Sequence, residues 1–285
     1  MIVLTGTSGQ LGSAVARQLV DRLPADQIVA SMRDSAKGVE AAKLGIGLRQ
    51  GDFTDPPSLS NAFAGADQVY IVSVSKLGEE ALRLHRAAID AAREAGARRI
   101  LYTSHMGARH GSPFAPADQH ASTEADLAKS GVSFTALRHG FYAESCLMIV
   151  GDGLKSGELR VPEDGPVAWT ARDDLAEADA VLLADEGRLD GTTPPLTARE
   201  AITMAELAVI ASEVTGREIR HVTVSDEEWR DAKVTAGTPA VYADMLLGTF
   251  RAARRDDFAA VDPTLEKVLG RRPLGMRDVL KTADL

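Results

Sequence analysis

The amino-acid sequence predicts an α/β protein with a doubly wound parallel sheet, followed by a smaller and mostly helical region. Short β-rich segments alternate with longer amphipathic segments through the first half of the chain, and a glycine-rich turn joins the first such pair. After Arg138 this alternation gives way to a turn-rich stretch and then to mainly helical patterns. Alternating strands and helices imply right-handed crossovers, which place helices on both faces of a parallel sheet.

The predicted strands are short segments rich in β-branched and apolar residues. They cover residues 1–5, 27–32, 46–50, 67–73, 98–104 and 132–138. The longer segments between them, such as residues 9–23 and 78–96, repeat apolar side chains at helical spacing. The first half of the chain therefore consists of successive strand–helix units.

Turn residues mark the ends of these helices. Pro56 follows Thr54 and Asp55, a pattern typical of a first helical turn in which one of the two preceding residues is the N-cap. Gly96 and Gly131 follow helical segments at positions where a C-terminal cap is expected.

The second half of the chain has a different pattern. Residues 151–166 are rich in glycine and turn residues, and residues 169–187 return to a helical pattern. From Thr192 onward helices dominate, with one strand predicted within residues 218–224. We expect this part to form the smaller region and to share an extended interface with the sheet.

Composition and charge exclude several classes of function. The 285 residues are 45% hydrophobic and 26% charged, as in an ordinary globular protein. A net charge of −9 argues against a general binder of nucleic acid or of anionic membranes. No apolar run approaches the roughly 20 residues that span a bilayer, and the apolar start stops at Gly6 instead of forming a signal peptide. The single cysteine, Cys146, forms no intramolecular disulfide and is expected as a small buried residue, so we expect a cytoplasmic protein.

The glycine-rich turn predicts a dinucleotide-binding Rossmann fold. Gly6, Gly9 and Gly12 are spaced GxxGxxG between a strand and a helix. One glycine forms the tight turn, another lets the backbone approach a pyrophosphate, and the third lets helix and strand pack closely. A turn that serves packing alone is the alternative, whereas a P-loop is excluded because no Gly-Lys-Ser/Thr follows.

Residues after the second and third strands suggest which dinucleotide binds. Arg33 stands where NAD binders place a carboxylate, and Lys37 follows one turn later. Cations at this place suit the 2′-phosphate of NADP(H). The alternative is that both cations form a solvated face and that Asp34 binds the ribose. Asp52 and Phe53, at the end of the third strand, are expected to border the adenine.

Three motifs carry a family resemblance. The segments TGTSGQLG (residues 5–12), YTS (102–104) and HASTEADLAKSGVSFTALRHGFYAES (120–145) resemble the NmrA-like group of atypical short-chain dehydrogenases/reductases. Within this group, quinone oxidoreductases of type 2 are most similar, with triphenylmethane reductases close to them. The similarity runs along nearly the whole chain, is densest before residue 145 and is loose in the C-terminal third.

The resemblance implies NADPH as the cofactor and assigns roles to matching positions. The phosphates would be held by Gly6, Thr7, Ser8, Gly9, Gln10, Leu11 and Gly12, and the 2′-phosphate by Arg33. The nicotinamide side would be lined by Ser73, Val74, Ser75, His139, Gly140, Phe141, Tyr142 and Glu144. A substrate pocket would open near Tyr142, between the sheet and the smaller region. The expected division is an NADP(H)-binding domain of residues 1–142, with 168–188 returning to it, and a smaller substrate-side region of residues 143–167 and 189–285.

The catalytic residues depart from the usual short-chain dehydrogenase pair. No tyrosine is followed four positions later by lysine, so the Tyr-x-x-x-Lys acid is absent from the sequence. Aligning on Glu124 puts Pro116 at the tyrosine position and His120 at the lysine position. We take His120, Ser104 and Tyr142 as the candidate catalytic residues. The ordinary titration range of histidine would let His120 donate a proton near neutral pH; the alternative is a surface or capping histidine.

These features favour reduction of quinones or similar conjugated electrophiles by direct hydride transfer, without flavin or metal. Such acceptors need orientation and a slot for a flat ring more than a strong acid. His105 and His110 lie close in sequence but lack a third ligand at metal spacing, so no metal site is expected. The expected partner is a planar electron acceptor, with a homodimer left open. The alternatives are a non-catalytic NADP(H) sensor of the NmrA type and a reductase of azo or triphenylmethane dyes.

Overall fold

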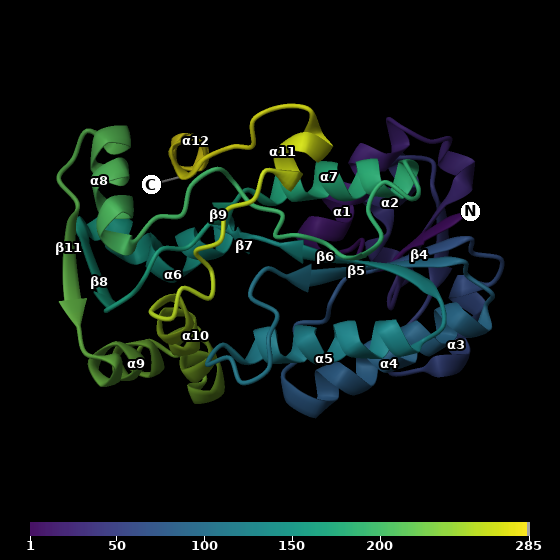
Figure 1. The fold of residues 1–285 in the computed structure, drawn as a ribbon, viewed down its shortest axis with the longest axis horizontal. Coiled ribbons are helices and arrows are strands. Elements are labelled where there is room, and N and C mark those ends of the chain that lie inside the picture. Colours follow the sequence, from purple (N-terminus) through teal and green to yellow (C-terminus); the bar gives the residue numbers. More distant parts are fainter. Residues whose placement is uncertain (284–285) are drawn as a thin grey trace.

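Seven parallel strands form the central sheet of this protein. The structure is a computed structural model that describes residues 1–283, and its ribbon is shown in Figure 1. The strands are β1 (Ile2–Leu4), β2 (Ile28–Met32), β3 (Gly47–Gln50), β4 (Gln68–Ile71), β5 (Arg99–His105), β6 (Ser133–His139) and β10 (Gly191–Thr192). Their order across the sheet is β10-β6-β5-β4-β1-β2-β3, and all neighbours are parallel. The six predicted strands are confirmed, and the order reverses between β1 and β4, where Rossmann folds bind dinucleotides.

Helices cover both faces of this sheet, as predicted. One face carries α1 (Gln10–Val20), α2 (Val39–Lys43), α7 (Arg172–Ala184) and α11 (Thr264–Leu269), and the other carries α3 (Pro56–Phe63), α4 (Gly78–Glu94) and α5 (Ala115–Lys129) (Figure 1). Short 3-10 turns cover Ala25–Gln27 and Ser35–Lys37. All residues of β1, β2 and β4 are buried. Burial on two faces explains why these strands are uniformly apolar instead of alternating.

The predicted helix ends are confirmed in position. Gly96 and Gly131 adopt left-handed φ values of 78° and 76° directly after α4 and α5. Asp55 is the N-cap residue of α3, and Pro56 is its first residue, but the Asp55 side chain makes no capping hydrogen bond. Pro56 has no N–H to be capped, so its fixed backbone angle begins the helix.

The smaller region surrounds a short two-stranded parallel sheet. Its elements are β7 (Phe141–Tyr142), α6 (Ala143–Ser156), β8 (Glu158–Pro162), β9 (Trp169–Thr170), α8 (Met204–Thr215), β11 (Arg220–Val224), α9 (Asp226–Thr235), α10 (Ala240–Ala253) and α12 (Met276–Thr282). The predicted strand within residues 218–224 is β11, which pairs with β8. Residues 151–166 are more regular than predicted. Helix α6 continues through Gly153, where a Cβ atom would lie 2.8 Å from the Glu158 carbonyl oxygen, so the glycine lets β8 pack against the helix.

Two elements from the last third of the chain return to the main sheet. Strand β10 pairs with β6, although residues 191–192 fall in the range expected for the smaller region. Helix α11 packs against α7, which itself packs against α1. The exact division of the chain into two regions stays a prediction.

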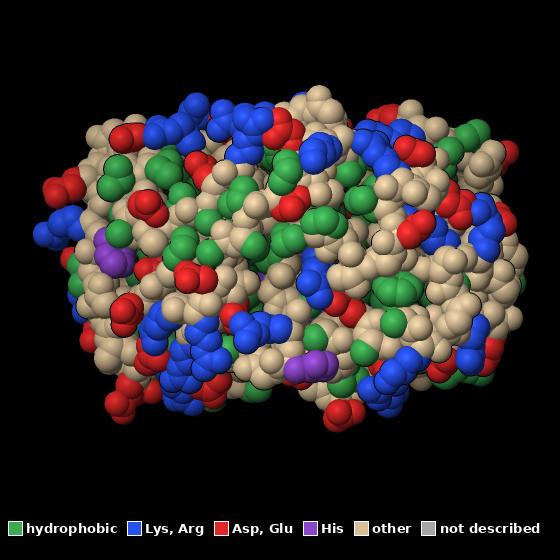
Figure 2. All heavy atoms as spheres, viewed as in Figure 1, with side chains coloured by type: hydrophobic (Ala, Val, Ile, Leu, Met, Phe, Trp, Pro, Cys, Tyr) green, Lys and Arg blue, Asp and Glu red, His purple; other side chains and the backbone are tan. Residues whose placement is uncertain are grey.

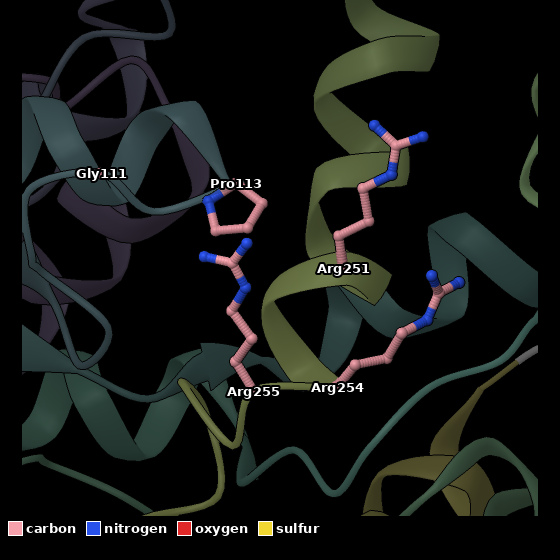
Figure 3. A pocket seen from close by; sticks show the side chains of 5 residues that line it. All are labelled: Gly111, Pro113, Arg251, Arg254 and Arg255. Atoms are coloured by element: carbon pink, nitrogen blue, oxygen red, sulfur yellow. The ribbon is translucent and has the colours of Figure 1, made fainter.

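Charged side chains of both signs are interspersed over the surface. Figure 2 shows this mixture on one face of the molecule. A surface hollow of about 500 Å³ is lined by Gly111, Pro113, Arg251, Arg254 and Arg255. The Arg251 and Arg254 guanidinium groups pair with Asp226 and point away from that of Arg255 (Figure 3), so the three cations do not converge on one point. No helix within residues 1–283 is long and apolar enough to cross a membrane.

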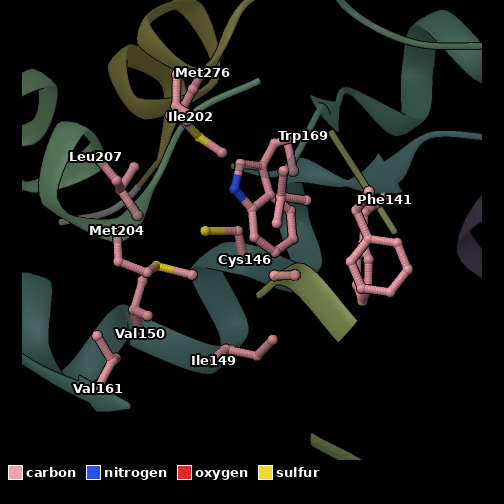
Figure 4. Close-up of a cluster of buried hydrophobic side chains, with 14 of the residues drawn as sticks. Phe141, Cys146, Ile149, Val150, Val161, Trp169, Ile202, Met204, Leu207 and Met276 are labelled. Carbon is pink, nitrogen blue, oxygen red and sulfur yellow. The ribbon is translucent and has the colours of Figure 1, made fainter. Parts of the chain in front are cut away.

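The core of the smaller region is aromatic and sulfur-rich. Figure 4 shows Cys146 beside Trp169, with Phe141 at one end of the cluster and Met276 near the other. Cys146 is fully buried, as predicted, and burial raises the pKa of its thiol well above the usual range. A buried neutral thiol behaves as a small apolar side chain.

Candidate active site

The glycine-rich turn brings backbone atoms closer than any side chain would allow. Gly6 has a φ of 68°, and a Cβ atom there would lie 2.7 Å from Cβ of Val72, the residue that follows β4. A Cβ atom on Gly12 would lie 2.4 Å from the Gly6 carbonyl oxygen. Gly9 is the N-cap residue of α1, and no side chain among the described residues caps this helix. The first N–H groups of α1 are therefore available to an anion.

The surroundings of this turn fit a dinucleotide phosphate. Thr7 is buried, and its Oγ1 atom has no hydrogen-bond partner within residues 1–283. A buried hydroxyl without a partner is unfavourable unless a ligand or water satisfies it. The open N–H groups and the positive end of the α1 dipole favour the same kind of ligand, a phosphate.

The predicted 2′-phosphate residues lie on the exposed edge beyond β2. Arg33 is exposed, and no carboxylate among residues 1–283 lies within 4.0 Å of its guanidinium. Lys37 is exposed at the end of the next 3-10 turn. Oδ1 of Asp34 accepts a hydrogen bond from the Ala36 N–H at 3.0 Å. One oxygen of this carboxylate thus stabilises the turn, and the choice between Asp34 and the two cations stays a prediction.

Asp52 and Phe53, which follow shortly after β3, both contact other residues of the protein. Oδ1 of Asp52 accepts hydrogen bonds from the N–H and the hydroxyl of Thr54, both at 2.8 Å. Phe53 is partly buried against the core under α3 and α4. Both remain beside the carboxyl edge of the sheet, and their contact with adenine stays a prediction.

The loop after β4 is held by side chains from three other elements. The N–H of Val72 donates to Thr5 Oγ1 at 2.9 Å, and that of Ser73 donates to Thr103 Oγ1 at 2.8 Å. The N–H of Val74 donates to His85 Nε2 at 3.0 Å. Because each amide has its own partner, the loop between the two halves of the sheet is fixed in place.

A cavity of about 340 Å³ opens beside this loop. Ser73, Val74 and Ser75 line one side of it, together with His120 from α5. The remaining walls are mostly apolar, and they come from the segment before α5, from β7 and from helices α6 and α10. Their aromatic and long apolar side chains are Phe114, Phe141, Met148, Ile149, Tyr242, Met245 and Leu246. The sheet and the smaller region thus form the cavity between them.

His120 reaches this cavity from the middle of α5. Its ring is partly buried, and Nδ1 lies 2.9 Å from the Tyr102 hydroxyl. Burial, and then the nearby His105, His85 and His139, lower the pKa of His120 well below its usual range. This direction disfavours proton donation by His120 near neutral pH, because a lowered pKa keeps the ring neutral there; the role of His120 stays a prediction. A neutral imidazole can still donate a hydrogen bond.

Ser104 lies beneath the cavity wall and does not line it. Its hydroxyl donates to the Glu124 carboxylate at 2.6 Å, and the serine is 3% exposed. Arg138 donates two hydrogen bonds to the same carboxylate, at 3.0 and 2.7 Å. The bidentate pair of Arg138 and Glu124 joins β6 to α5. The Ser104 hydroxyl proton is already donated to the Glu124 carboxylate.

Tyr142 belongs to a second polar cluster under the other face of the sheet. His139 lies between Tyr142 and Asp179: its Nδ1 is 3.3 Å from the Tyr142 hydroxyl and its Nε2 is 2.9 Å from Asp179 Oδ1. The Tyr70 hydroxyl donates to the other Asp179 oxygen at 2.5 Å. Burial, and then the Asp179 charge, raise the pKa of Tyr142. The Arg172 guanidinium lies 5.3 Å from the centre of its ring.

Two other residues of this segment hold neighbouring elements together. A Cβ atom on Gly140 would lie 2.2 Å from Thr170 Oγ1, so only glycine lets β9 pass at this distance. Glu144 accepts hydrogen bonds from the Arg172 N–H at 3.1 and 3.3 Å, at the first residue of α7. Of the residues predicted between 139 and 144, the structure brings only Phe141 to the cavity.

Comparison with known proteins identifies the family. The sequence model of the NmrA-like family matches residues 1–274. The chain belongs to the NmrA-like family. The predicted family resemblance is thus confirmed, and the relatives of this NmrA-like protein cover nearly its whole length.

Quinone oxidoreductase 2 of Escherichia coli (strain K12) is 35% identical over 271 residues, which are 95% of this chain and 94% of that protein. The crystal structure of the Escherichia coli NADPH-dependent quinone oxidoreductase complexed with NADPH has a TM-score of 0.92 at 33% identity, and the match covers 98% of each chain. The NAD(P)H azoreductase of Xenophilus azovorans is 30% identical over 95% of this chain and 93% of that protein. Triphenylmethane reductase of Citrobacter sp., complexed with NADP(H), has a TM-score of 0.92 at 30% identity and covers 99% and 100% of the two chains.

Sequence reasoning missed several residues of this NmrA-like site. Tyr102 and His85, which contact or neighbour His120, were not among the candidates, and neither was any residue of α10. One signal was available: Pro116, Gln119, His120 and Thr123 follow helical spacing, so they share one face of α5. Gln119 Oε1 accepts a hydrogen bond from the Gly78 N–H at 3.0 Å, which joins this face to the loop after β4.

The two histidines considered for a metal lie in different environments. His105 is enclosed by Phe114, Phe141 and Phe258, with ring centres 5.1 to 5.5 Å away. Burial lowers the pKa of His105 to about 3. His110 is exposed and lies 3.6 Å from Asp118. The pair therefore does not face a common point.

Proposed function

We propose that this protein is an NADPH-dependent reductase that transfers hydride directly to quinones or similar planar, conjugated acceptors, without flavin or metal. The observation that carries the proposal is the open, mostly apolar cavity of about 340 Å³ beside Ser73, Val74 and His120. Ligand pockets range from about 300 to 1,000 Å³ and combine apolar walls with a few polar groups. A protein that only binds the dinucleotide has no need of such a space.

The residues at the carboxyl edge of the sheet fit NADPH. The turn from Gly6 to Gly12 would hold the pyrophosphate, and Arg33 and Lys37 would hold the 2′-phosphate. When bound, the reduced nicotinamide supplies the hydride. The names of the relatives, a quinone oxidoreductase crystallised with NADPH and a triphenylmethane reductase crystallised with NADP(H), support this choice of cofactor.

The cavity residues would orient the acceptor. Phe114 and Phe141 would provide aromatic contacts for a flat substrate, and Met245 and Leu246 would provide apolar ones. His120 would donate a hydrogen bond to the acceptor oxygen that becomes negative during reduction. Its neutral ring keeps its own proton, so we propose that the hydroquinone anion takes its proton from water.

Ser104 and Tyr142 stay predictions as catalytic residues. Their hydroxyl groups hydrogen-bond to Glu124 and His139. We propose that they stabilise the elements around the site: Ser104 beneath His120, and Tyr142 beside the segment that carries Phe141.

Two alternatives differ in what the cavity accepts. A reductase of azo or triphenylmethane dyes would use the same site, and its relatives carry such names. A non-catalytic NADP(H) sensor would bind the cofactor and turn over no acceptor. A cytoplasmic location and a homodimer belong to this proposal as expectations from the sequence.

The test mixes purified protein with NADPH and three sets of acceptors: simple quinones, azo dyes and triphenylmethane dyes. We expect quinone-dependent loss of the NADPH absorbance, and a slower loss when NADPH carries deuterium at the transferred C4 position. Turnover of dyes alone would favour the second function. Tight NADPH binding without turnover of any acceptor would contradict the proposal and favour the sensor.

A further inference from the structure

We propose that Tyr102 and His85 are positioning residues that fix His120 as a neutral imidazole with its Nε2–H directed at the cavity. This inference rests on the role proposed above for His120. It follows from a chain of hydrogen bonds that runs from a backbone N–H group through His85 and Tyr102 to His120. Because the backbone N–H can only donate, the donor and acceptor of each later bond in the chain can be assigned in turn.

The chain begins at Val74, in the loop after β4. A backbone N–H can only donate, and the Val74 N–H lies 3.0 Å from Nε2 of His85. Nε2 of His85 must therefore be the ring nitrogen without a proton. In a neutral ring the proton is then on Nδ1, and burial, which lowers the pKa of His85 to about 4, keeps the ring neutral.

The next step lies between His85 and two hydroxyl groups. Nδ1 of His85 is 2.9 Å from Thr123 Oγ1 and 3.4 Å from the Tyr102 hydroxyl, so its proton is directed at these oxygens. The Thr123 hydroxyl donates its own proton to the Gln119 carbonyl oxygen at 3.0 Å. Since Nδ1 of His85 is a donor, Tyr102 cannot donate to it. Thr123 also neighbours the Tyr102 hydroxyl, but its oxygen already receives the His85 proton, so we assign Nδ1 of His120, at 2.9 Å, as the acceptor of the Tyr102 proton.

This assignment gives one neutral form for His120. Its Nδ1 accepts the Tyr102 proton, so its own proton is on Nε2. The ring lines the cavity and is partly exposed, whereas Tyr102 is fully buried. The protonated nitrogen is therefore the one left to face a ligand.

The chain also links two parts of the site that the sequence separates. Val74 lies in the loop expected beside the nicotinamide, and His120 lies on α5. His85 and Tyr102 join them through α4 and β5, so the donor nitrogen and the cofactor loop share one hydrogen-bonded frame. A donor fixed in this way needs no reorganisation when negative charge develops on the acceptor.

The direct test is nitrogen NMR on the wild-type protein without cofactor. Two-bond proton–nitrogen spectra of protein labelled with ¹⁵N-histidine distinguish the Nδ1–H from the Nε2–H form of each ring. At neutral pH we expect His120 as Nε2–H and His85 as Nδ1–H, with signals assigned from His120→Gln and His85→Asn. The same form in both rings, or a doubly protonated His120, would overturn the inference. The measurement needs no turnover, so it is independent of the proposed function.

Variants of His120 test the donor itself. In His120→Gln the amide NH₂ can occupy the place of Nε2, whereas in His120→Asn it can reach only the place of Nδ1. We expect kcat with a quinone to stay within about fivefold in His120→Gln and to fall about a hundredfold in His120→Asn, as when an oxyanion donor is lost. The NADPH Kd should be unchanged in both. Equal losses in both variants would contradict an Nε2–H donor.

Tyr102→Phe removes the hydroxyl and keeps the ring. We expect the His120 spectrum to change to a mixture of both neutral forms, and kcat to fall about five- to tenfold, the usual effect of one hydrogen bond. A fall in kcat with an unchanged His120 spectrum would mean that Tyr102 acts only through stability, and would overturn its positioning role. Melting curves of the variant check that it is folded.

Discussion

The Tyr102 hydroxyl and Nδ1 of His120 lie 2.9 Å apart, and this contact joins β5 to α5 at the wall of the cavity. Tyr102 is fully buried, and His105 and His85 lie beside the same pair of rings. The surroundings lower the pKa values of all three histidines. The site therefore contains a group of uncharged imidazoles under conditions in which free histidine begins to titrate.

Quinone reduction should not follow a histidine titration. Burial lowers the pKa of His120 well below its usual range, so we expect its ring to stay neutral from about pH 6 to 8. We expect kcat with a quinone acceptor to stay within about twofold across this range. If an imidazolium donated the proton, kcat would fall as pH rises through about 6.5, and such a profile would restore the proton-donor role for His120.

Stability should fall as the pH drops below the usual histidine range. His85 titrates at about 4 in the folded protein but near 6.5 when unfolded, so the unfolded state binds more protons between these values. Linkage then predicts that His85 alone lowers the free energy of unfolding by about 2 kcal/mol from pH 7 to pH 5. Urea unfolding at both pH values measures the change.

The variant His85→Asn lacks this titrating ring, and its loss of stability over the same pH interval should be smaller than in the wild type. The exposed His110 provides the matched control, since His110→Asn should leave the pH dependence unchanged. If all three proteins lose equal stability, the buried neutral state of His85 is refuted.

Gly12→Ala should weaken both cofactor binding and folding. The added methyl would lie 2.4 Å from the Gly6 carbonyl oxygen, so the turn or the helix must shift. We expect a loss of about 1–3 kcal/mol in the free energy of unfolding, typical of overpacking, and a large rise in the NADPH Kd. Isothermal titration and urea unfolding give the two values.

Gly151→Ala is the control for this substitution. Gly151 lies within α6, and a Cβ atom there meets nothing within 4 Å. It should stabilise the protein by about 0.5–1 kcal/mol, because alanine favours a helix more than glycine does. NADPH binding should not change. An equal effect of both substitutions on the Kd would argue against a cofactor at the turn.

Arg33→Ala should separate NADPH from NADH. Loss of charge-assisted hydrogen bonds to the 2′-phosphate should raise the NADPH Kd about ten- to hundredfold. The NADH Kd should stay the same, since NADH lacks that phosphate. Lys129→Ala removes an exposed cation at the end of α5 and should alter neither Kd. An unchanged NADPH Kd in Arg33→Ala would contradict the assignment of Arg33 to the 2′-phosphate.

A larger side chain on α10 that fills the cavity should weaken the reaction with the acceptor and leave NADPH binding unchanged. Met245 lines the cavity, and a larger ring in Met245→Trp would occupy part of the space for a quinone. We expect kcat/KM for the quinone to fall about tenfold or more, the effect of about 1.4 kcal/mol, with the NADPH Kd unchanged. Val241, which is 57% exposed on the same helix and does not line the cavity, allows Val241→Trp as the control. Equal losses in both would place the acceptor elsewhere.

The sequence was sufficient for the sheet and the glycine-rich turn because both depend on local patterns. Six of the seven strands of the main sheet are short β-rich runs bounded by turn residues, and Gly6 and Gly12 are required by close contacts. Local patterns also located the C-terminal glycines of α4 and α5. The helix that extends through Gly153 was missed, because its glycine is explained only by the packing of β8.

The contacts of the candidate site depend on packing between distant segments. His85 and Thr123 are 38 positions apart, and their hydrogen bond depends on how α4 and α5 pack side by side. The lowered pKa of His120 depends first on burial and then on three other histidines brought together by the fold, so it could not follow from the residue type alone. Helix α10 carries ordinary apolar residues, and nothing in their spacing distinguishes a cavity wall from a core.

One wall of the cavity comes from α10, which lies more than a hundred residues beyond the loop that is expected to contact the cofactor. Substitutions at Met245, Leu246 or Tyr242 can reshape this wall while Gly6, Arg33 and the hydrogen bonds of His85 stay as they are. Changes in a single helix can therefore alter the proposed acceptor site while the proposed cofactor site stays the same. Such a separation is consistent with a family in which similar chains are named for quinones, azo compounds and triphenylmethane dyes.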